Sequence, residues 1–272
     1  MTERKLIVNG LEIHTRIKGD AATAILFIHG SSLSSRIWDA QFTDPQLSRL
    51  YRLIAIDLPG HGQSSWAADA ALQYSFQGLA HVIKGVIDLL ELKSYILAGL
   101  SIGTNLAGEL TDPLPGCKGF FLTGPSPAAP HIDLDKIVLP FEYGAVLATP
   151  DPADAALENY IRGLVFSRNA ALLAELKNGY RHTDPAFRAN LGNILASRAW
   201  SDEIAQLNKH GLPVALVYGR EEQIVNTAYL RHEIPHPWKD EIILVDDAGH
   251  LANADQPAVF NRLLLDFAAS AG

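Results

Sequence analysis

The sequence predicts an α/β protein with a mostly parallel, eight-stranded sheet flanked by helices and with a helical segment inserted after the sixth strand. The first observation is that short, continuous apolar runs alternate with helical patterns along most of the chain. The second is that residues 126–207 carry helical patterns without such runs between them. With 272 residues, 48% of them hydrophobic, the chain is long enough to bury a large core.

The first two predicted strands form an antiparallel edge, and the other six are expected to be buried on both faces. Alternating runs at 5–9 and 11–18 meet at Asn9-Gly10, a dipeptide that supplies the positive φ angles of a two-residue hairpin turn. Continuous apolar runs indicate strands that are buried on both faces. They predict strands at 24–28, 53–56, 95–98, 119–122, 213–218 and 241–245. The clearest helix is predicted at 75–92, where apolar residues recur at spacings of three and four.

A helical insertion is predicted between the sixth and the seventh strand. It begins with a proline-rich stretch at 125–130, and its amphipathic segments span 156–166, 170–180 and 185–200. The sheet pattern resumes at Leu212. We therefore interpret residues 126–207 as a lid inserted into a core made of residues 1–125 and 208–272, and not as a separate domain.

The charge and the cysteine content argue against several classes of partner. The chain has 22 Lys and Arg against 30 Asp and Glu, a net charge of −8 that disfavours nucleic acid and anionic membranes. No apolar stretch approaches the roughly 18 residues that cross a bilayer, and no signal-peptide pattern opens the chain. The single cysteine, Cys117, cannot form an internal disulfide. We expect a soluble, cytoplasmic protein that acts on a small molecule.

Ser101 is predicted to be a catalytic nucleophile. It lies at the centre of Gly99-Leu100-Ser101-Ile102-Gly103, directly after the strand at 95–98 and before a predicted helix, which is the context of a nucleophile elbow. Small residues at both ends allow a sharp turn, and the start of the helix favours developing negative charge. This context makes an incidental serine in a glycine-rich turn the weaker interpretation.

Two backbone N–H groups are predicted to form the oxyanion hole. One belongs to Ser31, in the loop that follows the strand at 24–28, and the other belongs to Ile102, the residue after the nucleophile. His29, at the start of the same loop, is expected to be structural and not catalytic.

The general base is expected after the last strand, where His250 follows the run at 241–245. The carboxylate that orients it is expected after the penultimate strand, where Glu221 and Glu222 follow Gly219 and no aspartate is present. The third position after Gly219 is Glu222, which we therefore favour as the orienting carboxylate. Glu221 is the remaining alternative.

The segment His232-Glu233-Ile234-Pro235-His236 matches the His-Glu-x-x-His pattern of zinc hydrolases. That pattern needs both histidines on one face of a continuous helix, and Pro235 would interrupt such a helix. We therefore expect no metal and no cofactor.

With these residues placed, the chain resembles the α/β-hydrolase fold, and several stretches resemble the metal-free N-acyl-homoserine lactonases of that superfamily. These stretches are 28–32, 57–62, 119–124, 158–160, 219–222 and 247–250. In that family a glutamate occupies the place of Glu222, and a lid tyrosine that contacts the lactone corresponds to Tyr160. The family has tryptophan in place of Leu100 and Gly-His in place of Thr104-Asn105, so the resemblance leaves the shape of the pocket open.

The function implied is the opening of N-acyl-homoserine lactones, which is quorum quenching, through an acyl-enzyme on Ser101 with His250 and Glu222 as its partners. The expected substrate contacts are Tyr160, Leu100, Ser32, Leu164 and Phe166. A carboxylesterase or a carbon–carbon bond hydrolase would use the same triad. A hydrolase-like receptor that binds a lactone and turns it over poorly is an alternative of another class.

Overall fold

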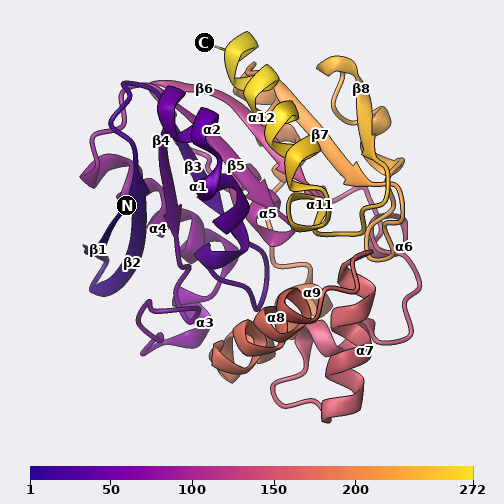
Figure 1. The fold of residues 1–272 in the computed structure, drawn as a ribbon. Helices are drawn as coiled ribbons and strands as arrows, with labels where there is room; N and C mark the ends of the chain where they lie inside the picture. The colour runs from indigo at the N-terminus through magenta and orange to yellow at the C-terminus, as the bar shows by residue number, and fades with distance from the viewer. Residues whose placement is uncertain (272) are drawn as a thin grey trace.

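The computed structural model describes residues 1–271, and an eight-stranded sheet runs through its centre (Figure 1). The strand order is β1-β2-β4-β3-β5-β6-β7-β8. The strands are β1 (Thr2–Val8), β2 (Leu11–Lys18), β3 (Ala24–Ile28), β4 (Arg52–Ile56), β5 (Tyr95–Leu100), β6 (Cys117–Thr123), β7 (Val214–Gly219) and β8 (Pro237–Val245). β2 pairs antiparallel with β1 and β4, and every other pair is parallel. The predicted mostly parallel sheet with an antiparallel edge is confirmed.

Helices cover both faces of the sheet. Successive side chains of a strand point to opposite faces, so each buried strand contributes to two hydrophobic cores. On one face, Leu26 and Leu97 belong to a core shared with α4 (Phe76–Leu89), α5 (Ile102–Gly108) and α10 (Glu203–Lys209). On the other face, their neighbours Ile25 and Ile96 pack in a core shared with α1 (Asp39–Thr43) and α12 (Pro257–Ala271). Burial on both faces explains why the sequences of β3 to β7 are continuously apolar. The same expectation for the strand at 241–245 is wrong, because β8 is the other edge strand and most of its residues are exposed or half-buried.

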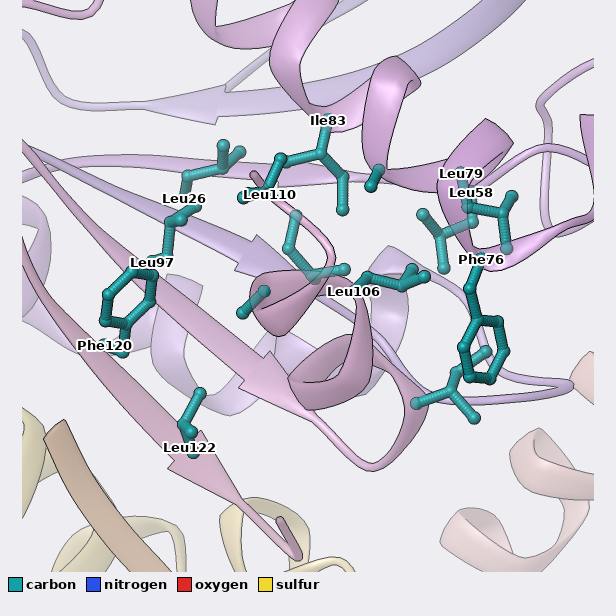
Figure 2. Packing of buried hydrophobic residues seen from close by; sticks show 14 of the residues in the cluster. Leu26, Leu58, Phe76, Leu79, Ile83, Leu97, Leu106, Leu110, Phe120 and Leu122 are labelled. Atoms are coloured by element: carbon teal, nitrogen blue, oxygen red, sulfur yellow. The ribbon is translucent and has the colours of Figure 1, made fainter. Parts of the chain in front are cut away.

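The first of these cores surrounds α5, the helix that follows the predicted nucleophile. Leu106 and Leu110 belong to the same cluster as the strand residue Leu97 and Ile83 of α4, as Figure 2 shows. α4 begins at Ser75, whose side chain accepts a hydrogen bond from the Gly78 N–H. The predicted helix at 75–92 is thus present, and it holds α5 against the sheet.

Smaller elements connect these layers. They are η1 (Ser35–Trp38), α2 (Pro45–Leu50), α3 (Ala70–Gln73), η3 (Tyr229–Arg231) and α11 (Ala252–Asp255). No helix within residues 1–271 combines the length and the apolar character needed to cross a lipid bilayer.

The segment between β6 and β7 is helical, as expected. It contains α6 (Leu134–Ile137), η2 (Gly144–Ala148), α7 (Asp154–Leu164), α8 (Ala170–His182) and α9 (Pro185–Ser197). Figure 1 shows α7, α8 and α9 grouped at one end of the molecule, beyond the sheet. α10, the last helix before β7, instead packs against α5, where a Cβ atom at Gly108 would lie 2.5 Å from the Glu203 Cβ. α10 therefore lies with the core, although the predicted lid boundary at residue 207 falls inside this helix.

Candidate active site

Ser101 lies at the sharp turn between β5 and α5, with φ 54° and ψ −123°. A residue with a side chain adopts such angles rarely and at an energetic cost. The turn is held by a hydrogen bond from the Ser101 N–H to the Thr123 carbonyl oxygen at 2.9 Å. A Cβ atom at Gly99 would lie 2.7 Å from the Gly103 carbonyl oxygen, and one at Gly103 would lie 2.5 Å from the Ile28 carbonyl oxygen. Glycine is needed at both positions because the backbones approach so closely.

The loop after β3 runs alongside this turn. A Cβ atom at Gly30 would lie 3.0 Å from the Ser101 Cβ, so the neighbouring Ser31 is close to the predicted nucleophile. Ile102 is the first residue of α5, and its N–H is one of those at a helix start that have no acceptor within the helix. The two predicted oxyanion donors thus lie on the two segments that meet at Ser101.

Two buried histidines hold the loop in place. His29 Nδ1–H donates to the Gly30 carbonyl oxygen at 2.7 Å, and its Nε2 accepts from the Leu58 N–H at 2.9 Å. His61 Nε2 accepts from the Ser32 N–H at 3.2 Å. Burial lowers the pKa of His29 and lowers that of His61 to about 3, so both rings stay neutral. Their ring nitrogens are occupied by backbone groups, as the expected structural role of His29 requires.

The contribution of His61 was missed from the sequence. The sequence signal for His61 is the segment Asp57-Leu58-Pro59-Gly60-His61. This segment follows the end of β4, at the edge of the sheet where the loop after β3 also begins. From the sequence, this segment indicates only the resemblance to the fold and no contact with the loop after β3.

His250 and Glu222 form a buried pair. His250 Nδ1 lies 2.7 Å from Glu222 Oε2, and both side chains are almost fully shielded from solvent. The second oxygen of Glu222 accepts the N–H groups of Ile224 at 2.7 Å and of Val225 at 3.3 Å. A carboxylate can only accept, so it favours the tautomer with the proton on Nδ1, and in that neutral imidazole His250 Nε2 is a hydrogen-bond acceptor.

The neighbouring acidic residues make other contacts. Glu221 Oε2 accepts the Ala248 N–H at 3.1 Å, and Asp246 is paired with Arg220. Asp247 is exposed. The contact with His250 therefore belongs to Glu222 and not to Glu221.

Gly124, the residue after β6, makes room for the imidazole. A Cβ atom at Gly124 would lie 2.8 Å from the His250 Cε1. Gly124 follows Thr123, which accepts the Ser101 N–H, so His250 lies beside the elbow. Within residues 1–271 there is no hydrogen bond between the Ser101 hydroxyl and His250. Such bonds are often long in the absence of substrate and shorten when it binds.

Ser101 is one of the residues that line a small pocket. The pocket is lined by Phe76, Ser101, Ile102, Asn105, Ser126, Ala128, Leu134, Ile137, Val138, Leu147, Leu191, Leu195, Trp200, Ile224 and Val225. Among the described residues, no charged side chain lines it. The insertion supplies much of its apolar wall, through residues that were not singled out from the sequence. The signal available was the amphipathic pattern of 185–200, which contains Leu191, Leu195 and Trp200.

The predicted substrate contacts do not line this pocket. Leu100 is fully buried in the core, and the Ser32 N–H is used by His61. Leu164 is buried, and its carbonyl oxygen accepts the Leu251 N–H at 3.1 Å. Phe166 is 46% exposed at the surface. The expectation that Leu164 and Phe166 form the apolar wall is therefore not met at this pocket.

Tyr160 is buried in α7, where its ring centroid lies 6.2 Å from that of Phe141 and 6.4 Å from that of Tyr180. Burial raises the pKa of its hydroxyl, which is therefore protonated at neutral pH. Its helix ends at Leu164, which contacts the loop that carries His250.

The His-Glu-x-x-His segment does not form a helix. Residues 232–236 follow η3 as a turn and a bend, so His232 and His236 do not share a helix face. In residues 1–271 no group of three His, Cys, Asp or Glu side chains is arranged to hold a metal ion. The absence of a metal stays a prediction.

A parallel sheet with a serine at the elbow after β5 and a histidine–carboxylate pair at the same edge defines a class of hydrolases. The chain belongs to the alpha/beta hydrolase family, whose model matches residues 25–263. It is a hydrolase of the α/β type.

Two solved structures illustrate the resemblance. The N-acyl homoserine lactonase AidH, complexed with N-butanoyl homoserine, is 25% identical with a TM-score of 0.89, over 100% of this chain and 97% of that one. An esterase from a Rhodococcus species is 22% identical with a TM-score of 0.84 over 100% of both chains, which shows the shared fold. The predicted resemblance to α/β-hydrolases that include a homoserine lactonase is confirmed.

A curated relative carries the name of a different hydrolase. A 2-hydroxy-6-oxononadienedioate/2-hydroxy-6-oxononatrienedioate hydrolase from Cupriavidus pinatubonensis is 26% identical over 280 residues, 94% of this chain and 90% of the relative.

Proposed function

We propose that this hydrolase opens the lactone ring of N-acyl-homoserine lactones, with Ser101, His250 and Glu222 as its catalytic triad. The observation that carries the proposal is the buried Glu222–His250 pair beside Ser101, which itself lines a pocket without charged side chains among the described residues. The similarity to AidH supports a lactone as the substrate. The physiological role would then be quorum quenching.

In the first half of the reaction, Ser101 Oγ attacks the ring carbonyl carbon and its proton passes to His250 Nε2. Glu222 keeps the other ring nitrogen protonated and stabilises the imidazolium. The N–H groups of Ser31 and Ile102 stabilise the oxyanion. The ring C–O bond then breaks, and His250 returns the proton to the departing alkoxide, which stays attached to the acyl group as a hydroxyl.

In the second half, a water molecule gives a proton to His250 and attacks the acyl carbon. The bond to Ser101 Oγ breaks, the serine regains its proton, and the N-acyl-homoserine leaves as a hydroxy acid. The insertion would act as a lid that shields the acyl chain, a role suited to the apolar Leu191, Leu195 and Trp200.

The charge of the pocket favours a neutral acyl group over a dioate such as that named for the Cupriavidus relative. Two carboxylates that leave water need cationic partners, and the pocket has none among residues 1–271. Arg188, the buried arginine of the insertion, donates to carbonyl oxygens of Thr149, Pro150, Tyr180 and Thr183 and is thereby occupied.

Although Tyr160 does not line the pocket of Ser101 in the described structure, it is proposed to contact the lactone when that ligand is bound. Support comes from the family resemblance and from its place one turn before Leu164, which contacts the His250 loop. Tyr160→Phe should raise KM for lactones several-fold and leave the fold intact. Unchanged KM would limit Tyr160 to packing.

The deciding experiment supplies acyl-homoserine lactones of several chain lengths, simple aryl esters and a dienedioate, and follows acid release with a metal chelator present. We expect lactone turnover in the wild type and none with Ser101→Ala. Ester turnover without lactone turnover would make the protein a carboxylesterase, and dienedioate turnover would make it a carbon–carbon bond hydrolase. Stoichiometric lactone binding without turnover would point to a receptor.

A further inference from the structure

Among the described residues, Asn105 and Ser126 are the side chains with hydrogen-bond acceptor oxygens, besides Ser101, that line the pocket. Both are tied to the elbow. The Ser126 N–H donates to Thr104 Oγ1 at 3.0 Å, and the Thr104 hydroxyl donates to the Ser101 carbonyl oxygen at 2.6 Å. The position of the pair relative to the predicted nucleophile is therefore set by backbone and side-chain bonds.

The orientation of the Asn105 amide follows from its partners. Its Nδ2 donates to the Ser126 carbonyl oxygen at 2.6 Å and to Glu203 Oε2 at 2.7 Å. A backbone carbonyl oxygen can only accept, so the NH₂ group must face this side. Glu203 is fully buried, and Glu203 Oε2 also accepts the Ala128 N–H at 2.6 Å. Both amide hydrogens of Asn105 are thus used inside the protein.

The hydroxyl of Ser126 is oriented by the other end of this amide. Ser126 Oγ lies 2.7 Å from Asn105 Oδ1. The amide oxygen carries no hydrogen, so Ser126 must donate its single hydroxyl proton to it. What remains on both atoms is lone pairs. The pair can accept hydrogen bonds from a molecule in the pocket but can donate none.

We propose that Asn105 Oδ1 and Ser126 Oγ form an acceptor site that selects substrates with a hydrogen-bond donor, an amide N–H or a hydroxyl, next to the scissile carbonyl. The inference rests on the proposed function in taking Ser101 as the nucleophile. An N-acyl-homoserine lactone carries an amide N–H on the ring carbon beside the carbonyl, and a simple aryl ester has no such group. An analogue with an ester oxygen in place of the amide N–H would place its own acceptor against Asn105 Oδ1 and Ser126 Oγ. Neither side would then have a hydrogen to donate, so no hydrogen bond would form.

The test compares two lactones of the same size, one with an acylamino group and one with an acyloxy group on the carbon beside the ring carbonyl. Their binding to Ser101→Ala is measured by calorimetry, so that neither lactone is consumed. We expect the acylamino lactone to bind about tenfold more tightly. In Ser101→Ala with Ser126→Ala one of the two acceptor atoms is removed, so this ratio should fall below that in Ser101→Ala. Leu195→Ala, which shortens the apolar wall, is the matched control and should weaken both lactones by the same factor.

Equal affinities in Ser101→Ala, or no binding of either lactone, would overturn the inference. A lactone that binds in this way but is not opened by the wild type would instead refute the proposed function, so the two failures are distinguishable. If the Ser126→Ala protein does not fold, N-methylation of the acylamino lactone removes the donor from the ligand. The methylated lactone should then bind about tenfold more weakly to Ser101→Ala, and equal binding would again overturn the inference.

Discussion

Glu222→Gln changes one buried atom and reverses the direction of one hydrogen bond. Glu222 Oε1 accepts two backbone N–H groups, those of Ile224 and Val225, while Oε2 accepts from His250 Nδ1. In the glutamine variant the amide oxygen must stay on the two N–H donors, so the NH₂ group faces His250. The imidazole then has to present a lone pair at Nδ1 and carry its proton on Nε2. That nitrogen can no longer take the proton of Ser101.

The expected loss follows from this wrong tautomer and from the lost stabilisation of the imidazolium. We expect kcat to fall by about 10³- to 10⁴-fold, which corresponds to roughly 4 to 5 kcal/mol of barrier. The isosteric change should leave the thermal unfolding midpoint nearly unchanged, because no cavity or buried charge is created.

The assay measures kcat on an aryl ester and on an acyl-homoserine lactone, at neutral pH. Glu221→Gln is the matched control, because its amide oxygen can still accept the Ala248 N–H that Glu221 accepts. We expect it to stay within a few-fold of the wild type. More than a tenth of wild-type kcat in Glu222→Gln, or a greater loss in Glu221→Gln, would refute the assignment of Glu222.

Three further predictions concern the strained elbow, a buried histidine and the space for the base. Ser101→Gly should abolish activity and raise the free energy of unfolding by about 1 kcal/mol in urea titrations, because glycine tolerates φ 54°; a lower value than in Ser101→Ala would contradict the argument. The pKa of His61 falls from its ordinary 6.5 to about 3 on folding, so its neutral form stabilises the protein above pH 6.5 and that contribution is lost as the pH falls towards 3. Urea unfolding between pH 6.5 and 4 should therefore depend on pH more steeply in the wild type than in His61→Asn, by about 1.4 kcal/mol per pH unit; equal slopes would disprove it. Gly124→Ala places a Cβ 2.8 Å from the His250 Cε1 and should cost about 100-fold in kcat. Gly211→Ala, which has a similar positive φ of +62° and no atom within 4 Å, should keep its activity, and equal losses would show that backbone strain alone is responsible.

The sheet could be predicted because the information is local. Runs such as 24–28 and 95–98 are continuously apolar, and the structure has strands there because both faces are covered by helices. The triad candidates were found for a related reason. Ser101, Glu222 and His250 each follow a strand of a parallel sheet, and the carboxyl ends of such strands meet at one edge.

The choice between two adjacent acids needed the tertiary structure. Glu221 and Glu222 differ by one position in sequence, and only the packing of the loop after β7 against the His250 loop decides which carboxylate meets the imidazole. Counting from Gly219 favours Glu222. In a loop without regular periodicity, however, the position in the sequence does not define the direction of a side chain.

The pocket was the part that the sequence alone could not determine. Periodicity marked apolar helix faces in the insertion, but Leu164 is as apolar as Leu191. Both pack in hydrophobic clusters, and only Leu191 of the two also lines the pocket. The orientation of Asn105 depends on Glu203, 98 positions away in the chain. Local patterns determined which elements form and which strand ends carry chemistry, because neighbouring residues decide those features. Which side chains face the substrate, and whether they donate or accept, is decided by contacts between segments that only the folded chain brings together.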